Sequence, residues 1–172
     1  GDSITITTNS KVIDGKGAVV DMAGSHICAL TVSANDVTIK NFTFKNADCY
    51  GNGGAIYFNS GGNVINCNFT DNSASYGGAI VFNEIGTVEN CNFIDNLATN
   101  DGGAVYFYGG GTLTNCNFTD NEATSGNGGT IFFNGFGTVE NCNIVNNTAK
   151  YRGAIFMISG SIINCNLTDN KG

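Results

Sequence analysis

Residues Gly53 to Ala74 read GGAIYFNSGGNVINCNFTDNSA, and close copies of this stretch begin at Gly77, Gly102, Gly128 and Arg152. The copies share an Asn-Cys-Asn triplet whose cysteines are separated by 24, 25, 26 and 23 residues. These cysteines are Cys67, Cys91, Cys116, Cys142 and Cys165. A repeat of this length is typical of solenoids, propellers and other arrays.

Each copy contains three short segments with the alternating pattern of a β-strand. The first places Ile56 and Phe58 on one face, and the second contributes Val64 to the same face. A bend at Asn66 follows, because Asn tolerates the left-handed backbone conformation of sharp turns. The third segment, residues 67–69, places its Cys and Phe inward and its Asn outward. This order of strands and bends predicts one coil of a parallel β-helix.

Single coils of this kind cannot bury their own apolar face and must stack on one another. Stacking brings equivalent residues to about 4.8 Å, so that like side chains form ladders. We expect the cysteines above to form one inward ladder. We also expect a ladder of amide hydrogen bonds at the bend, formed by Asn66, Asn90, Asn115, Asn141 and Asn164.

The sequence therefore predicts an all-β protein, a parallel β-helix of about six to seven coils of 23–26 residues. Residues 1–172 form a single domain in this interpretation, with a degenerate coil at 1–26 and regular coils at 27–172. The absence of Pro fits strands that all need their amide donors. The 25 Gly and 27 Asn argue against a helical protein.

Charge and hydropathy exclude several classes of partner. The net charge is −7, and the seven basic residues do not cluster, which argues against nucleic acid and anionic membrane surfaces. No apolar run has the length of a transmembrane segment, so we expect no membrane insertion.

The seven cysteines do not follow the spacing of a zinc site, which needs closely spaced pairs. The five ladder cysteines are expected to behave as small buried hydrophobic residues. Ladder neighbours lie close enough for disulfides to form, so occasional pairing stays open. Cys28 and Cys49 fall outside the ladder. We expect no metal or cofactor.

Two families share the motifs of this chain. The combination of Gly53–Ile56 with Phe69–Asn72 resembles the repeat of chlamydial polymorphic outer membrane proteins. Ile13–Gly17, Val37–Asn46 and the coils that follow resemble the adhesin-like β-helix proteins of methanogenic archaea more closely. This resemblance covers nearly the whole chain. It implies a right-handed, pectin-lyase-like β-helix on the cell surface that serves in adhesion or as a wall component.

The outward positions of the first strand form a candidate interaction face. Exposed apolar ladders tend to mark interfaces, and aromatic rings can stack on sugars or on a neighbouring protein. The alternative is that a loop covers these side chains, or that they only stabilise the sheet. The residues are Tyr57, Val81, Tyr106, Phe132 and Phe156.

Five Asn-x-Ser/Thr triplets fit a glycosylated surface protein, although such triplets also arise by chance in an Asn-rich chain. They begin at Asn41, Asn68, Asn117, Asn146 and Asn166.

Acidic and basic residues give no clear catalytic set. The repeated acids Asp71, Asp95, Asp120 and Asp169 share one position, where turn capping is the simpler explanation than cation binding. Arg152, the only Arg, either anchors an acidic glycan or is an exposed substitution in a loop. His26, the only His, lies in an irregular segment and is not expected to be catalytic.

The resulting hypothesis is a non-catalytic, extracellular adhesin or structural module of the cell surface. Its partner would be a cell-surface glycan or protein. The first alternative is a fibre subunit that binds other copies of itself end to end through open coils. The second is a polysaccharide lyase or hydrolase.

Overall fold

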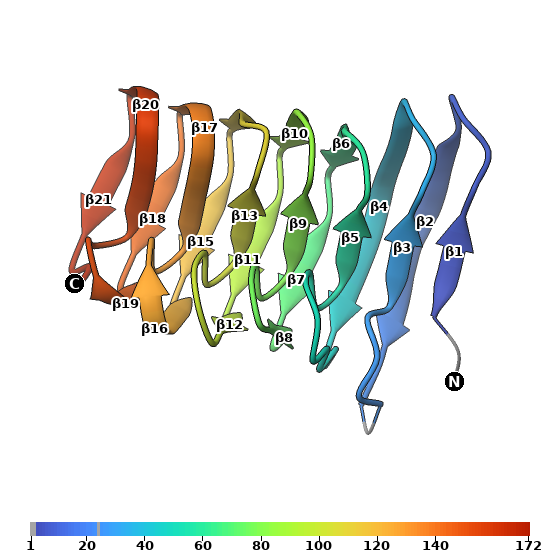
Figure 1. Cartoon of the computed structure of the whole chain (residues 1–172), viewed down its shortest axis with the longest axis horizontal. Helices are drawn as coiled ribbons and strands as arrows, with labels where there is room; N and C mark the ends of the chain where they lie inside the picture. Colours follow the sequence, from blue (N-terminus) through green and yellow to red (C-terminus); the bar gives the residue numbers. More distant parts are fainter. Residues whose placement is uncertain (1–2, 24) are drawn as a thin grey trace.

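The computed structural model describes residues 3–23 and 25–172, which wind into a stack of coils running from one end of the molecule to the other (Figure 1). The strands are β1 (Ile4–Ile6), β2 (Val12–Asp21), β3 (Leu30–Val32), β4 (Val37–Lys45), β5 (Ile56–Phe58), β6 (Gly62–Ile65), β7 (Asn68–Thr70), β8 (Ser73–Ala74), β9 (Ile80–Phe82), β10 (Gly86–Glu89), β11 (Asn92–Ile94), β12 (Leu97–Ala98), β13 (Val105–Phe107), β14 (Gly111–Thr114), β15 (Asn117–Thr119), β16 (Glu122–Asn127), β17 (Ile131–Glu140), β18 (Asn143–Val145), β19 (Thr148–Tyr151), β20 (Ile155–Ile163) and β21 (Asn166–Thr168).

Strands of successive coils pair in parallel and in register. Phe93 of β11 pairs with Phe69 of β7 on one side and with Phe118 of β15 on the other. Val105 of β13 lies between Ile80 and Ile131 in the same way. The predicted all-β parallel solenoid is therefore confirmed, with about seven turns.

The prediction of three strands per coil omits a fourth. The strands β8, β12, β16 and β19 form a separate four-stranded parallel sheet, in the segment between the third predicted strand of one copy and the start of the next copy. Each of these strands contains a buried alanine, such as Ala98 of β12. β8 and β12 have only two residues, and the buried side chain that the four strands share is a small alanine, so the alternation is too weak to be recognised from the sequence.

Stacked phenylalanines fill much of the interior. In one ladder, ring centroids of Phe69, Phe93 and Phe118 are separated by 4.8 and 4.7 Å. A second ladder runs through Phe58, Phe82, Phe107 and Phe133 with spacings of 4.6, 5.1 and 4.5 Å. Burial of these rings supplies much of the apolar area that stabilises each coil.

Two columns of polar residues turn the backbone at the ends of strands. Asn66, Asn90, Asn115, Asn141 and Asn164 have φ values between 50° and 55°. The acids Asp71, Asp95, Asp120 and Asp169 also adopt the left-handed conformation, with φ between 53° and 56°. Both residue types visit this region at lower steric cost than most others.

Gly78 lies where two coils approach closely. A Cβ atom there would lie 2.2 Å from the carbonyl oxygen of Gly103 and 2.6 Å from that of Leu97. Both atoms belong to the backbone, so they cannot move without displacing a coil. We expect Gly78→Ala to lower the free energy of unfolding by about 1–3 kcal/mol. Urea denaturation measures this change. Gly51→Ala is the control, because its Cβ would meet only the Cys49 Sγ at 3.5 Å. If Gly78→Ala and Gly51→Ala unfolded at the same urea concentration, the prediction would be contradicted.

No helical segment in residues 3–23 and 25–172 has the length and hydrophobicity that a bilayer crossing requires.

Candidate functional site

The predicted interaction face is largely covered. Its rings do stack, with centroids of Tyr106 and Phe132 at 4.8 Å and of Phe132 and Phe156 at 4.7 Å. However, Val81, Tyr106 and Phe132 are only 0, 5 and 7% exposed. The prediction of an exposed face is therefore wrong for these three residues. Tyr57 and Phe156 are half-buried at the margins of the same cluster.

Neighbouring loops supply the cover. Tyr76 packs edge-on against Tyr106 with ring centroids 5.4 Å apart, and the Tyr108 ring lies 4.5 Å from Tyr106. This burial raises the pKa of Tyr106 well above its usual range. The guanidinium of Arg152 lies 5.2 Å from the centre of the Phe156 ring, so part of this side chain covers the cluster. The alternative that loops cover the face therefore holds for most of it.

The continuous amide ladder lies at a different position from the one we predicted. Asn66 donates to the Oδ1 of Asn41 at 2.6 Å, and Asn90 donates to Glu89 at 3.1 Å. Within the described chain, no amide hydrogen bond joins Asn66 to Asn90 or links the later members of that column. These bend residues are exposed. What they share is a left-handed backbone conformation, without a continuous chain of side-chain hydrogen bonds.

The observed ladder follows the second bend and points inward. In all five members the side-chain amide nitrogen donates to a carbonyl in the preceding coil at 2.8–3.1 Å. In all but the last, it also donates to the Asn Oδ1 of the next coil at 2.9–3.0 Å. Its members are Asn72, Asn96, Asn121, Asn147 and Asn170. The first four are buried. We infer that this ladder fixes the register of the stack.

The predicted glycosylation sites differ in their surroundings. Asn68 and Asn117 are exposed on the outer face and are both hydrogen-bonded to Asn92, each at 2.8 Å. Asn166 is exposed and donates to Asn143 at 2.7 Å. Asn146 is exposed and donates to Asp120, whereas the half-buried Asn41 donates to Asp14 at 2.8 Å.

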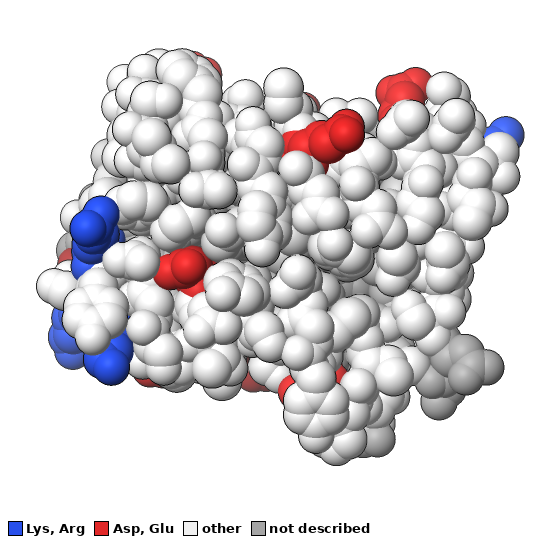
Figure 2. Space-filling view, viewed as in Figure 1, with Lys and Arg blue, Asp and Glu red and all other residues white. Residues whose placement is uncertain are grey.

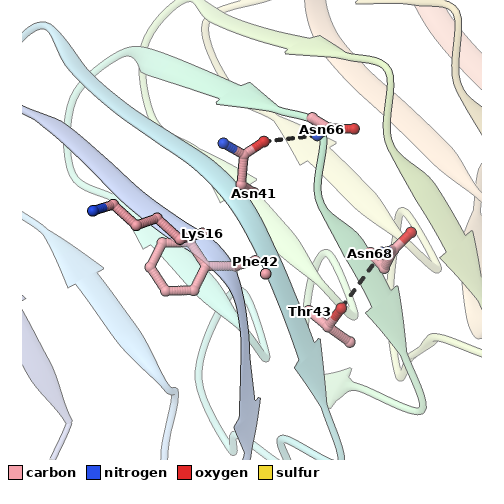
Figure 3. Close-up of a pocket in the computed structure, with 7 residues that line it drawn as sticks. Lys16, Asn41, Phe42, Thr43, Asn66 and Asn68 are labelled. Atoms are coloured by element: carbon pink, nitrogen blue, oxygen red, sulfur yellow. Dashed lines mark hydrogen bonds between the residues drawn. The ribbon is translucent and has the colours of Figure 1, made fainter.

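A shallow hollow of 360 Å³ contains two of these sites (Figure 3). Asn41 and Asn68 line it with Lys16, Phe42 and Thr43. Asn68 donates to the Thr43 hydroxyl at 3.4 Å. The hydrogen bond from Asn41 is the main cause of the lowered pKa of Asp14, just outside the hollow. Apart from Lys16, the polar side chains that line this hollow are uncharged amides and a hydroxyl.

The five ladder cysteines are free thiols. Four are buried and Cys165 is half-buried. Each thiol donates to the carbonyl two residues earlier at 3.2–3.3 Å. Burial raises the pKa of the Cys91 thiol well above its usual range, which keeps this thiol protonated and unreactive.

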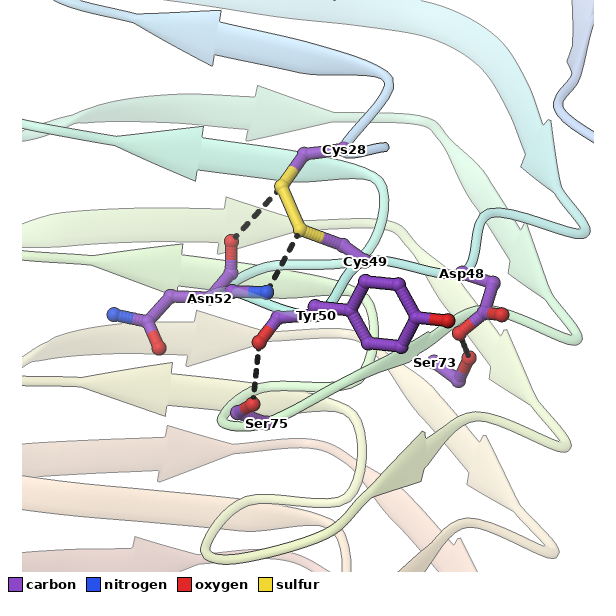
Figure 4. The surroundings of a disulfide bond; sticks show 8 residues. Cys28, Asp48, Cys49, Tyr50, Asn52, Ser73 and Ser75 are labelled. Atoms are coloured by element: carbon purple, nitrogen blue, oxygen red, sulfur yellow. Dashed lines mark hydrogen bonds between the residues drawn. A yellow bond between two sulfur atoms is a disulfide. The ribbon is translucent and has the colours of Figure 1, made fainter. Parts of the chain in front are cut away.

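The two cysteines outside the ladder form a disulfide with Cα atoms 4.8 Å apart (Figure 4). Cys28 precedes β3, and Cys49 belongs to the connection between β4 and β5. The amide of Gly51 donates to the Cys49 Sγ at 3.3 Å. The disulfide therefore fixes the connection between β4 and β5 to the segment that precedes β3.

Removing this disulfide with Cys28→Ser and Cys49→Ser together should lower the free energy of unfolding by about 3 kcal/mol, because the crosslink closes a segment with a sequence separation of 21. Urea denaturation with and without a reductant measures the change. The reductant should shift the midpoint of the parent chain and leave that of the double variant unchanged, since the ladder thiols are free. A shift in both proteins would contradict this assignment.

The disulfide loop brings together polar and aromatic side chains that we did not group from the sequence. The His26 Nδ1 lies 2.7 Å from the Asp48 Oδ2, and the His26 ring stacks on Tyr50 with centroids 5.2 Å apart. The Ser73 hydroxyl donates to Asp48 Oδ1 at 2.8 Å, and the Ser75 hydroxyl donates to the Tyr50 carbonyl at 2.7 Å. One signal was available: the chain from Asp48 to Asn52 is one residue longer than its counterpart, residues 73–76.

Two hollows flank the Tyr50 side chain. One, of 210 Å³, is lined by Asp48, Ser73, Ser75 and Thr99 among others. The other, of 350 Å³, includes His26 and Thr31. Across the described residues, no group of three or more His, Cys, Asp or Glu side chains is placed to hold a metal ion. The loop is suited to hydrogen bonding and ring stacking.

Comparison with known proteins supports the architecture. The sequence model of the family described as "right handed beta helix region" matches residues 25–172. No curated protein and no solved structure matches the chain. The family match spans most of the sequence and agrees with the parallel coils seen in the structure. The chain belongs to the right-handed β-helix family.

Proposed function

We propose that this chain is a non-catalytic module of the cell surface, acting outside the cell as an adhesin or a structural element. The observation that carries the proposal is the Cys28–Cys49 disulfide. Disulfides persist in oxidising compartments such as the cell surface. The motif resemblance to archaeal adhesin-like β-helix proteins is consistent with this assignment.

The character of the surface supports an uncharged or weakly polar partner. Figure 2 shows a face on which most side chains carry no charge, with basic groups gathered near the C-terminal end. Only 12% of the residues are charged. Neutral amides and hydroxyls favour a glycan or protein partner over nucleic acid.

The positions of the acids support a non-catalytic role. Asp71, Asp95 and Asp120 are neighbours in one column of bends, each with a left-handed backbone. Burial and the charges of the other two raise the pKa of Asp95. Their repetition fits a backbone role that every coil needs, whereas glycosidases place one defined pair of carboxylates across the scissile bond.

Binding and cleavage assays on the same preparation test the proposal. The purified chain should bind intact cell surfaces, or material extracted from them, saturably. It should release no new reducing ends and no unsaturated products from neutral or acidic polysaccharides, with or without Ca²⁺. Saturable binding without cleavage is the expected result. Turnover of any polysaccharide would favour the lyase or hydrolase alternative and overturn the proposal.

A second candidate is end-to-end assembly of copies of this chain. The last coil exposes Ile162, Ile163 and Leu167. The first coils surround an apolar hollow of 140 Å³ whose lining includes Ile4 and Phe42. Pairing of strands between copies would cover both surfaces. Sedimentation velocity and electron microscopy over a range of concentrations test this candidate. Filaments would support it, and a single monomeric species at high concentration would rule it out.

A further inference from the structure

We propose that the disulfide-bonded loop around Tyr50 is a binding site for a neutral saccharide. The inference rests on the proposed surface function and names the ligand class and the place where it binds. Four features carry it: the interruption of the repeat, the fixed aromatic ring, the hydroxyl-rich hollow beside the ring and the local charge.

The loop interrupts the regular array of coils, as do the register shifts between β2 and β4, between β16 and β19 and between β17 and β20. Bridges between Asp48 and Ser73 and between Asn52 and Tyr76 keep its two ends in register with the next coil. Between these bridges, the backbones of Cys49 and Gly51 still bond to the next coil, whereas the side chain of Tyr50 is 76% exposed. In Figure 4 the Tyr50 ring projects from the loop between the disulfide and Asp48.

Contacts on several sides hold the ring in place before any ligand binds. The disulfide at the adjacent Cys49 fixes one side of the loop, and the Ser75 hydroxyl fixes the Tyr50 carbonyl at 2.7 Å. The His26 ring covers one face of Tyr50 at an interplanar angle of 23°. His26 is itself fixed by Asp48 at 2.7 Å. Little conformational entropy is lost when such a preorganised ring binds a ligand.

The hollow beside the ring has the mixed chemistry of a sugar. Asp48 supplies acceptors, and so do the hydroxyl oxygens of Ser73 and Ser75, whose protons are donated to Asp48 and to the Tyr50 carbonyl. The Thr99 hydroxyl can both donate and accept. Leu97, partly exposed, adds an apolar wall. A pyranose presents C–H groups on its faces and hydroxyls around its rim, so the ring and the wall match the faces while the polar groups match the rim.

The second hollow extends the site beyond one sugar unit. It lies along His26, Cys28 and Thr31 and also touches Tyr50. The two hollows measure 210 and 350 Å³ and share Cys49 and Tyr50 in their linings. The geometry therefore fits a short oligosaccharide that passes across Tyr50.

Charge selects the class of sugar. Among the described residues that line the two hollows there is no Lys or Arg, and the carboxylate of Asp48 lies in the first hollow. A uronic acid or sulfated sugar would meet this carboxylate without a compensating cation. We therefore assign hexose or N-acetylhexosamine oligosaccharides in place of acidic ones.

Binding of the whole chain, with its disulfide intact, to a glycan array tests the assignment. The array carries neutral hexose and N-acetylhexosamine tetrasaccharides and, for comparison, uronic-acid tetrasaccharides. Binding to at least one neutral tetrasaccharide is expected, and titration calorimetry then gives its affinity. Tyr50→Ala should weaken this affinity at least about tenfold, since it removes the stacking surface. Asp48→Asn keeps the shape of the side chain and should weaken binding several-fold. Circular dichroism and urea midpoints verify that each variant folds.

Tyr151→Ala is the matched control, because Tyr151 is 52% exposed on β19 and lines neither hollow. Its affinity for the same tetrasaccharide should equal that of the parent chain. Neutral-glycan binding that survives Tyr50→Ala would overturn the site and leave the surface function intact. Preference for acidic glycans, or binding to a cell-surface protein with no glycan on the array, would overturn the ligand class. Failure to bind any cell surface would overturn the proposed function as well.

Discussion

Replacing Asn96 with Ala should lower the free energy of unfolding by at least about 3 kcal/mol, because several buried groups lose their partners at once. The Oδ1 of Asn96 accepts from the Asn72 amide at 3.2 Å and from the Asn72 side chain at 3.0 Å. Its Nδ2 donates to the Phe69 carbonyl at 3.0 Å and to Asn121 at 2.9 Å. Alanine can replace none of these bonds, and each buried group left unpaired costs about 1–3 kcal/mol.

Urea denaturation of Asn96→Ala beside Asn90→Gly measures this effect. Asn90 is exposed at the first bend, with φ of 54°, and Gly adopts this conformation without strain. We expect the control to change stability by no more than about 0.5 kcal/mol. If Asn90→Gly destabilised the chain as strongly as Asn96→Ala, the column at the first bend would be the one that holds the coils together.

Phe93→Ala should destabilise the chain by about 3–5 kcal/mol, the range for truncating a fully buried aromatic side chain. The ring is completely buried between Phe69 and Phe118, with centroid distances of 4.8 and 4.7 Å. Removing it leaves a gap in the middle of a ladder. The backbone hydrogen bonds of the parallel strands hold the coils above and below at a fixed spacing, which limits collapse into the gap.

Thermal and urea denaturation of Phe93→Ala and Phe136→Ala test this expectation. Phe136 is 62% exposed, so its truncation should change stability by no more than about 0.5 kcal/mol. A small effect at Phe93, similar to that at Phe136, would mean that the coils close around the missing ring and that the ladder contributes little.

The inward alternation was the part of the fold that sequence could predict. Ile56 and Phe58 alternate with one outward residue, and so do Cys67 and Phe69. Both pairs lie in the core because a two-residue period fixes which side of a strand a side chain takes. The alternation could be recognised because it repeats in five copies of the sequence. Parallel pairing could be predicted because equivalent strands of successive copies must stack on one another.

The Asn ladder could not be located from the same pattern. Each full coil has Asn at three nearby positions, for example Asn66, Asn68 and Asn72. Asn66 and Asn72 both lie at bends, where the two-residue period no longer applies. The left-handed conformation falls on Asn66 at the first bend and on Asp71 at the second, so the amide of Asn72 points inward. Backbone dihedral angles, which the sequence does not specify, decide between the two columns.

The candidate site was missed for a related reason. Tyr50, His26 and Asp48 meet only because the Cys28–Cys49 disulfide and the stacking of coils bring separate segments together. The covered aromatic face differs from the sequence prediction for the same reason, since Tyr76 and Tyr108 reach it from loops outside the strand. The alternation of residues along a strand shows which side chains lie on each face of the sheet. It does not show which loop packs against the outer face.

The constant separation between paired strands has a consequence for how the chain folds. Inside the stack, strands such as β10, β11 and β13 pair with a strand one coil earlier and a strand one coil later, so each new coil closes a loop of nearly the same length. The entropic barrier to adding a coil is then nearly uniform along the molecule. A nascent chain with its first coils formed already presents a complete row of free amides and carbonyls. Order can therefore advance from that row coil by coil as synthesis proceeds, without waiting for contacts between the two ends.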